Sequence, residues 1–144
     1  MSDLRFKVLL VEDNPGDARL IRETLVDVAD TAFDLECTDR LAAGLARLKA
    51  ADIDVVLLDL ALPDSRGYDT FAAAQAEVPH LPIIVLTGLG DEALALRTVK
   101  NGAQDYLLKG QVDGNLLARA IRYAIERKRA EQQTANSTRS WNNG

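Results

Sequence analysis

Short apolar runs alternate along the chain with longer segments whose apolar residues recur at helical spacing. The runs lie at residues 6–11, 33–38, 54–59, 82–87 and 103–109, and their lengths are typical of β-strands. Runs 54–59 and 82–87 are apolar without alternation, which predicts strands that are covered on both faces. Run 33–38 alternates instead, which predicts a strand at the edge of a sheet.

The intervening segments predict five amphipathic helices, at residues 14–29, 39–50, 67–78, 91–102 and 113–133. Asn14 is suited to cap the first helix and Pro15 to occupy its first position. Asp91 is suited to cap the fourth helix, and Gly102 to end it. A strand followed by a helix, five times over, predicts an α/β fold in which one doubly wound parallel sheet has helices on both faces.

Residues 1–129 carry this pattern, and we interpret them as one domain. Residues 130–144 are polar, so we expect a C-terminal helix extension and tail that is flexible, or a linker truncated from a longer chain. The last helix has an apolar stripe that gives way to the charged sequence ERKRAEQQ. It is either a terminal helix that packs on the sheet and frays, or a linker to a dimerisation coil or output domain.

Composition narrows the class of protein. The chain has 144 residues, of which 47% are hydrophobic and 27% charged, as in an ordinary globular domain. It contains neither a membrane-spanning run nor a signal peptide, so we expect a cytoplasmic protein without a membrane partner. A net charge of −5 disfavours nucleic-acid binding. The single cysteine, Cys37, cannot form an internal disulfide and is expected to be a buried strand residue.

Polar residues that could bind ligands or take part in a reaction stand where the predicted strands end. They are Glu12 and Asp13 after the first strand, Asp59 after the third, Thr87 after the fourth and Lys109 after the fifth. Because parallel strands place their carboxyl ends at one edge of a sheet, we expect these side chains to lie together.

This set of residues favours phosphoryl chemistry that depends on Mg²⁺. Clustered carboxylates repel one another unless a cation intervenes, and Mg²⁺ prefers such oxygen ligands. Glu12, Asp13 and Asp59 could supply them, together with the backbone carbonyl of Ala61. An aspartate beside Mg²⁺ can attack phosphorus to form an acyl phosphate. Lys109 would then offset the negative charge of the phosphoryl group, and the Thr87 hydroxyl would donate a hydrogen bond to it.

Each residue also has an ordinary interpretation when it is taken alone. Glu12 and Asp13 could cap a helix, and Asp59 could accept hydrogen bonds from loop amides. Thr87 could simply end a strand, and Lys109 could be a solvated charge. The functional interpretation rests on finding all of them on the appropriate strands.

The chain resembles the receiver domain of two-component response regulators, of the CheY-like superfamily. The resemblance covers roughly residues 5–129 and lies in the sequences LLVEDNPGDA, VVLLDLALPDSRGYD, PIIVLTG and GAQDYLLKG. It implies the flavodoxin-like strand order 2-1-3-4-5 and phosphorylation of Asp59. It also implies that Asp13 binds Mg²⁺ directly, that Glu12 does so directly or through water, and that Thr87 and Lys109 contact the phosphoryl group.

The resemblance further implies a conformational switch and a set of partners. Tyr106 matches the family's aromatic switch residue, although it could also be a half-buried strand aromatic. The phosphoryl donor would be a histidine kinase or a histidine phosphotransfer protein. The face formed by the fourth helix, fifth strand and fifth helix would contact an output domain, another partner or a second copy in a homodimer.

Two positions depart from the common family pattern. Gly110 follows the lysine where many receivers have proline, so we expect a trans peptide bond with Gly110 forming the turn. Ala61 is small, and should leave the site more open.

Two other functional classes compete with a phosphorylation switch. A phosphatase of the haloacid dehalogenase type would need a second aspartate at the position of Ala61, so we do not expect an enzyme. A phosphorylation-independent interaction module on a receiver scaffold remains an alternative. Such modules usually lack part of the acidic set that this chain retains.

Overall fold

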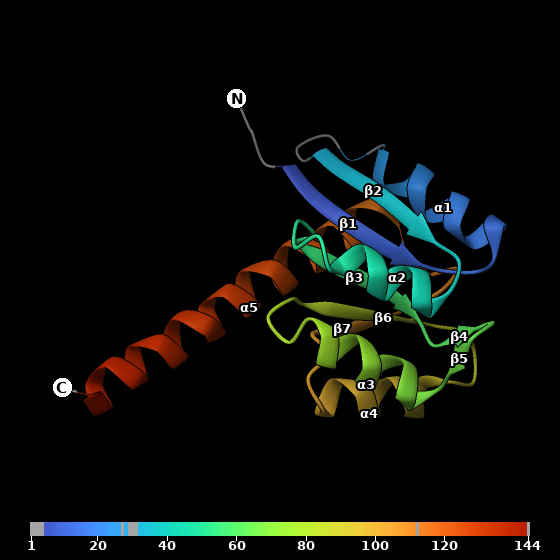
Figure 1. Ribbon diagram of the computed structural model, residues 1–144. Coiled ribbons are helices and arrows are strands. Elements are labelled where there is room, and N and C mark those ends of the chain that lie inside the picture. Colours follow the sequence, from blue (N-terminus) through green and yellow to red (C-terminus); the bar gives the residue numbers. More distant parts are fainter. Residues whose placement is uncertain (1–4, 27, 29–31, 112, 144) are drawn as a thin grey trace.

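A five-stranded parallel sheet forms the centre of the computed structural model, which describes residues 5–26, 28, 32–111 and 113–143 and side chains up to residue 133 (Figure 1). The strands of the sheet are β1 (Arg5–Val11), β2 (Ala32–Thr38), β3 (Val55–Asp59), β6 (Ile83–Thr87) and β7 (Asp105–Leu108). They lie in the order β2-β1-β3-β6-β7. Without the small hairpin that bears the intervening numbers, this is the order 2-1-3-4-5, and the predicted fold class is confirmed.

Helices cover both faces of the sheet. One face carries α1 (Pro15–Val26) and α5 (Gly114–Asn143), and the other carries α2 (Leu41–Leu48), α3 (Tyr68–Glu77) and α4 (Glu92–Lys100). Successive strand residues point to opposite faces. Leu57 of β3 therefore packs with Ile121 of α5, whereas Leu58 packs with Phe71 of α3. All five residues of β3 and all five of β6 are buried, as the continuous apolar runs predicted.

The edge strand β2 is more exposed than the central strands. Its cysteine, Cys37, is exposed, so the expectation that this side chain is buried was wrong. The reason is the position of the strand, because β2 has a hydrogen-bonding neighbour on one side only.

Most predicted local signals are found at the element ends. Asn14 caps α1, because its Oδ1 accepts the N–H of Asp17 at 3.0 Å. The helix ends at Val26, and the predicted continuation to residue 29 includes residues 27 and 29, which lie outside the described part. Asp91 occupies the N-cap of α4 but makes no capping hydrogen bond through its side chain there. Gly110 has a φ of +85° and no cis peptide bond is found among the described residues, as expected.

One feature of the fold was not expected from the sequence. A small antiparallel hairpin, β4 (Ala61–Leu62) and β5 (Ser65–Arg66), follows β3 and was not predicted, because each strand has only two residues. The backbone of α5 is helical through Asn143, and its C-terminal half projects beyond the sheet (Figure 1). No proline or glycine lies between Gly114 and Gly144 to end this helix. The expectation that residues 130–144 are a flexible helix extension and tail, or a truncated linker, stays a prediction. Among the described residues, no helix is both long and apolar enough to cross a bilayer.

Candidate functional site

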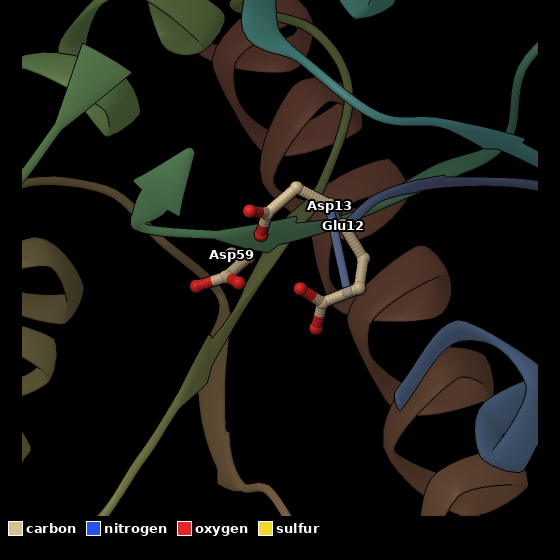
Figure 2. Close-up of side chains that lie close together, drawn as sticks. All are labelled: Glu12, Asp13 and Asp59. Atoms are coloured by element: carbon tan, nitrogen blue, oxygen red, sulfur yellow. The ribbon is translucent and has the colours of Figure 1, made fainter. Parts of the chain in front are cut away.

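Three carboxylates meet at the carboxyl edge of the sheet. Glu12 and Asp13 follow β1 directly, and Asp59 is the last residue of the neighbouring strand β3. One oxygen from each lies within 4.8 Å of the other two, and Figure 2 shows the carboxyl groups around a common space. The predicted convergence of these side chains is therefore found.

Lys109 joins this cluster from the end of β7. Its Nζ lies 2.6 Å from Glu12 Oε1 and 2.8 Å from Asp59 Oδ2. The backbone N–H of Lys109 donates to the carbonyl of Thr87 at 2.8 Å, which fixes this residue beside the end of β6. Burial opposes a charged ammonium, but the close carboxylates of Asp59 and Glu12 outweigh that effect and raise the pKa of Lys109. The ammonium is therefore charged and held between two carboxylates.

Glu12 is the most strongly perturbed acid of the cluster. The residue is 2% exposed, and burial together with the neighbouring Asp59 raises the pKa of Glu12 from 4.5 to about 7, although Lys109 opposes the change. Glu12 Oε1 is buried and makes only the ion pair with Lys109, without hydrogen-bond geometry. One half-buried ammonium therefore only partly compensates this carboxylate.

A small cavity lies on the other side of Asp59. It has a volume of about 40 Å³, and its lining includes Asp59, Ala61, Thr87 and Gly88. The Thr87 side chain is buried at its edge, where the hydroxyl donates to the Gly88 carbonyl at 3.3 Å. This long hydrogen bond can be exchanged for a better acceptor. Ala61 is exposed, and its N–H donates to Asp59 Oδ1 at 3.0 Å.

Tyr106 lies one residue inside β7, in register with Val85 of β6. It is half-buried and packs against the hydrophobic cluster beneath α2, α3 and α4. The side chain therefore stands next to the strand that ends in Thr87. Its role as a switch residue stays a prediction.

Asp17 is a member of the site that the sequence analysis missed. Its Oδ2 lies 3.3 Å from Lys109 Nζ, so α1 contributes a further carboxylate to the same ammonium. A usable signal was present, since Asp17 is an acidic residue in the first turn of the helix that directly follows Glu12 and Asp13.

The donor set fits a hard divalent cation. The three carboxylates offer oxygen ligands, and they repel one another. The raised pKa of Glu12 is a further sign that the site lacks positive charge. Mg²⁺ favours carboxylate and carbonyl oxygens over nitrogen or sulfur. Glu12, Asp13 and Asp59 could hold such an ion, and the Ala61 carbonyl could add a fourth oxygen.

Comparisons with known proteins agree with this geometry. Residues 8–122 match the family model of the response regulator receiver domain. The chain is 30% identical over 132 residues to the cell cycle transcriptional regulator CtrA of Caulobacter vibrioides, covering 92% of this chain and 55% of CtrA. The cell cycle response regulator CtrA of Brucella ovis is 31% identical over 132 residues, with the same coverage. The chain thus spans about half the length of these relatives.

A solved structure shows the same likeness in three dimensions. The crystal structure of a response regulator receiver domain protein from Clostridium thermocellum has a TM-score of 0.75 and 30% sequence identity to this chain. The alignment covers 87% of this chain and 98% of that protein.

Proposed function

The chain belongs to the response regulator receiver family, and we propose that it is a phosphorylation-activated switch whose phosphoacceptor is Asp59. The observation that carries this proposal is the position of Asp59 at the end of central strand β3. There its carboxylate lies 2.8 Å from Lys109 Nζ and within the 4.8 Å cluster of Glu12 and Asp13. We propose a histidine kinase or a histidine phosphotransfer protein as the phosphoryl donor.

The proposed reaction transfers one phosphoryl group. An oxygen of the Asp59 carboxylate forms a bond to the phosphorus of a phosphohistidine on the donor. The phosphorus–nitrogen bond breaks, and its electron pair remains on the donor imidazole. The product is an acyl phosphate on Asp59, which is hydrolysed when water attacks phosphorus.

Lys109 and Thr87 would stabilise the charge of the transferred group, the first by its positive charge and the second by a hydrogen bond. The group's three oxygens carry charge that fixed donors stabilise. Lys109 is already an ion-pair partner of Asp59 and would pair with one oxygen. Thr87 lines the same cavity, and its hydroxyl would leave the Gly88 carbonyl to donate to a second oxygen.

Four groups would hold Mg²⁺ in this site: the carboxylates of Glu12, Asp13 and Asp59, and the carbonyl of Ala61. When bound, the ion supplies positive charge that offsets the carboxylates and the remaining phosphoryl oxygen. Ala61 is exposed and has a small side chain, which leaves the approach to Asp59 open to a donor.

The switch would run through Thr87 and Tyr106. A shift of Thr87 toward the phosphoryl group would open space at the end of β6, and the half-buried Tyr106 ring would turn inward. The face made by α4, β7 and α5 would then be repacked for an output domain, another partner or a homodimer. A longer relative, of which this chain matches 55%, is named a transcriptional regulator, so an output domain that binds DNA in a longer protein is consistent with this proposal.

The test is the intact mass after incubation with acetyl phosphate, with Mg²⁺ or with a chelator. Wild type is compared with Asp59→Asn. Asp54→Asn is the matched control, because Asp54 is the aspartate that immediately precedes the same strand, β3. Asp54 accepts the backbone N–H of Lys7 at 2.8 Å and lies outside the cluster. We expect one added phosphoryl group that requires both Mg²⁺ and Asp59 and that survives in Asp54→Asn.

Two results would count against the proposal. A wild type that gains no phosphoryl group, even with products trapped early, would favour a phosphorylation-independent interaction module. A phosphoryl group that persists in Asp59→Asn would mean that another residue accepts it.

A further inference from the structure

The hairpin β4–β5 carries an acidic residue, Asp64, whose side chain reaches another part of the fold. Asp64 lies at the tip of the hairpin, between Leu62 and Ser65, which pair across it. Its Oδ1 accepts the N–H of Leu41 at 2.8 Å, and its Oδ2 accepts the N–H of Ala42 at 2.9 Å. Both amides belong to the first turn of α2. Asp64 therefore caps a helix that begins 23 residues earlier in the chain.

α2 lacks a cap of its own in the described part of the chain. Arg40 occupies the N-cap without a side-chain capping bond, and the first turn of α2 contains no acidic residue. A carboxylate at a helix N-terminus satisfies free amides and opposes the partial positive charge there. These amide hydrogen bonds also lower the pKa of Asp64, so its carboxylate is ionised around neutral pH.

The hairpin needs such an anchor because it is very short. A pair of two-residue strands cannot hold its shape by its own hydrogen bonds. The buried side chain of Leu62 fixes one face, and the Gly67 N–H closes the base by donating to the Leu60 carbonyl at 2.7 Å. The tip is held by the Asp64 carboxylate.

The anchored segment is also the one that faces the phosphorylation site. Ala61 lies on β4 and donates its N–H to Asp59 Oδ1 at 3.0 Å. In the proposed function, its carbonyl would be a ligand for Mg²⁺. Only two residues separate Ala61 from Asp64. The two hydrogen bonds between Asp64 and α2, which we call the clamp, therefore limit how far the Ala61 backbone can move.

We propose that Asp64 is a positioning residue for phosphorylation, because its clamp on α2 holds the Ala61 backbone against Asp59 and the metal. This inference rests on the proposed function and adds a residue that touches neither the phosphoryl group nor the ion. Loss of the clamp should weaken Mg²⁺ binding and slow phosphorylation, beyond any effect on folding.

The experiment compares Asp64→Ala and Asp64→Asn with wild type. Asp113→Ala is the matched control, because Asp113 Oδ1 accepts the N–H of Leu116 at 2.8 Å near the start of α5. Three quantities are measured for each: Mg²⁺ affinity by calorimetry, the initial rate of phosphorylation by acetyl phosphate, and hydrogen exchange of the hairpin amides. Thermal unfolding measures the loss of stability that Asp64→Ala and Asp113→Ala should share, because each removes a helix cap.

For Asp64→Ala we expect a loss of Mg²⁺ affinity of about tenfold, the lower end of what disturbing an outer-shell partner usually costs. The phosphorylation rate at limiting Mg²⁺ should fall in parallel, and the amides around Ala61 should exchange faster. Asp64→Asn keeps one accepting oxygen and should lie between wild type and the alanine variant. Asp113→Ala should have a lower melting temperature than wild type but the same Mg²⁺ affinity.

Equal Mg²⁺ affinities and rates in Asp64→Ala and Asp113→Ala would overturn the inference and reduce Asp64 to an ordinary helix cap. If Asp64→Ala does not fold, an Asp64→Asn variant with wild-type affinity and rate would overturn it equally. A wild type that binds Mg²⁺ but accepts no phosphoryl group would refute the proposed function instead. The Mg²⁺ affinities of the variants would then still show whether the clamp contributes to metal binding.

Discussion

Replacing Glu12 by glutamine should stabilise the metal-free protein, and the gain should depend on pH. Glu12 is 2% exposed, and burial with the proximity of Asp59 raises its pKa from 4.5 to about 7. A group with a raised pKa in the folded state contributes stability that is complete below its unfolded pKa. That stability is lost as the pH rises through the folded pKa. For Glu12 the window runs from about 4.5 to about 7.

The magnitude follows from the difference between the two pKa values. Each pKa unit corresponds to about 1.4 kcal/mol, so ionised Glu12 costs the folded state up to about 3 kcal/mol. Glutamine has the shape of the neutral acid and does not titrate. Glu12→Gln should therefore match wild type at about pH 4 and exceed its free energy of unfolding by up to about 3 kcal/mol at about pH 8.

The assay is urea unfolding in a chelator across this pH range. Glu23→Gln is the matched control, because Glu23 is an exposed acid paired with Arg19 on the surface of α1, and it should change stability little. Saturating Mg²⁺ should reverse the order, since wild type then has an additional ligand. A Glu12→Gln variant that is less stable than wild type at about pH 8 without metal would refute the reasoning, as would a difference independent of pH.

Two further predictions concern the cation of the site and the core. Lys109→Ala should lose about 2–3 kcal/mol without metal, because Glu12 and Asp59 are left without their cation. Mg²⁺ should raise the melting temperature of this variant more than that of wild type, and an equal rise would show that ion and ammonium do not share these ligands. Phe71→Ala removes a wholly buried ring and should cost about 3–5 kcal/mol in urea unfolding. A loss below about 1 kcal/mol would mean that α3 does not anchor its face of the sheet.

The sheet could be predicted from the sequence because its signals are strong and local. Continuous apolar runs at 54–59 and 82–87 identify strands covered on both faces, and the helices between them impose parallel pairing. The convergence of Glu12, Asp59 and Lys109 follows from the same pattern, since parallel strands end at one edge. Their chemical roles stay predictions.

The remaining features depend on contacts that sequence patterns do not reveal. The clamp from Asp64 to α2 joins residues far apart in the chain, and a cap is normally sought next to its own helix. The β4–β5 hairpin has no periodicity to detect. The exposure of Cys37 depends on which strand lies at the edge of the sheet.

The most direct test of the account is the identity of the phosphorylated residue. Wild type is phosphorylated with acetyl phosphate and Mg²⁺, reduced with borohydride, digested and sequenced by mass spectrometry. Borohydride converts an aspartyl phosphate into homoserine, which marks the acceptor permanently. We predict homoserine at residue 59 in samples that contained Mg²⁺, and unmodified aspartate there when the ion was chelated. Homoserine at Asp13 or at another acid, with Asp59 unmodified, would contradict the central claim.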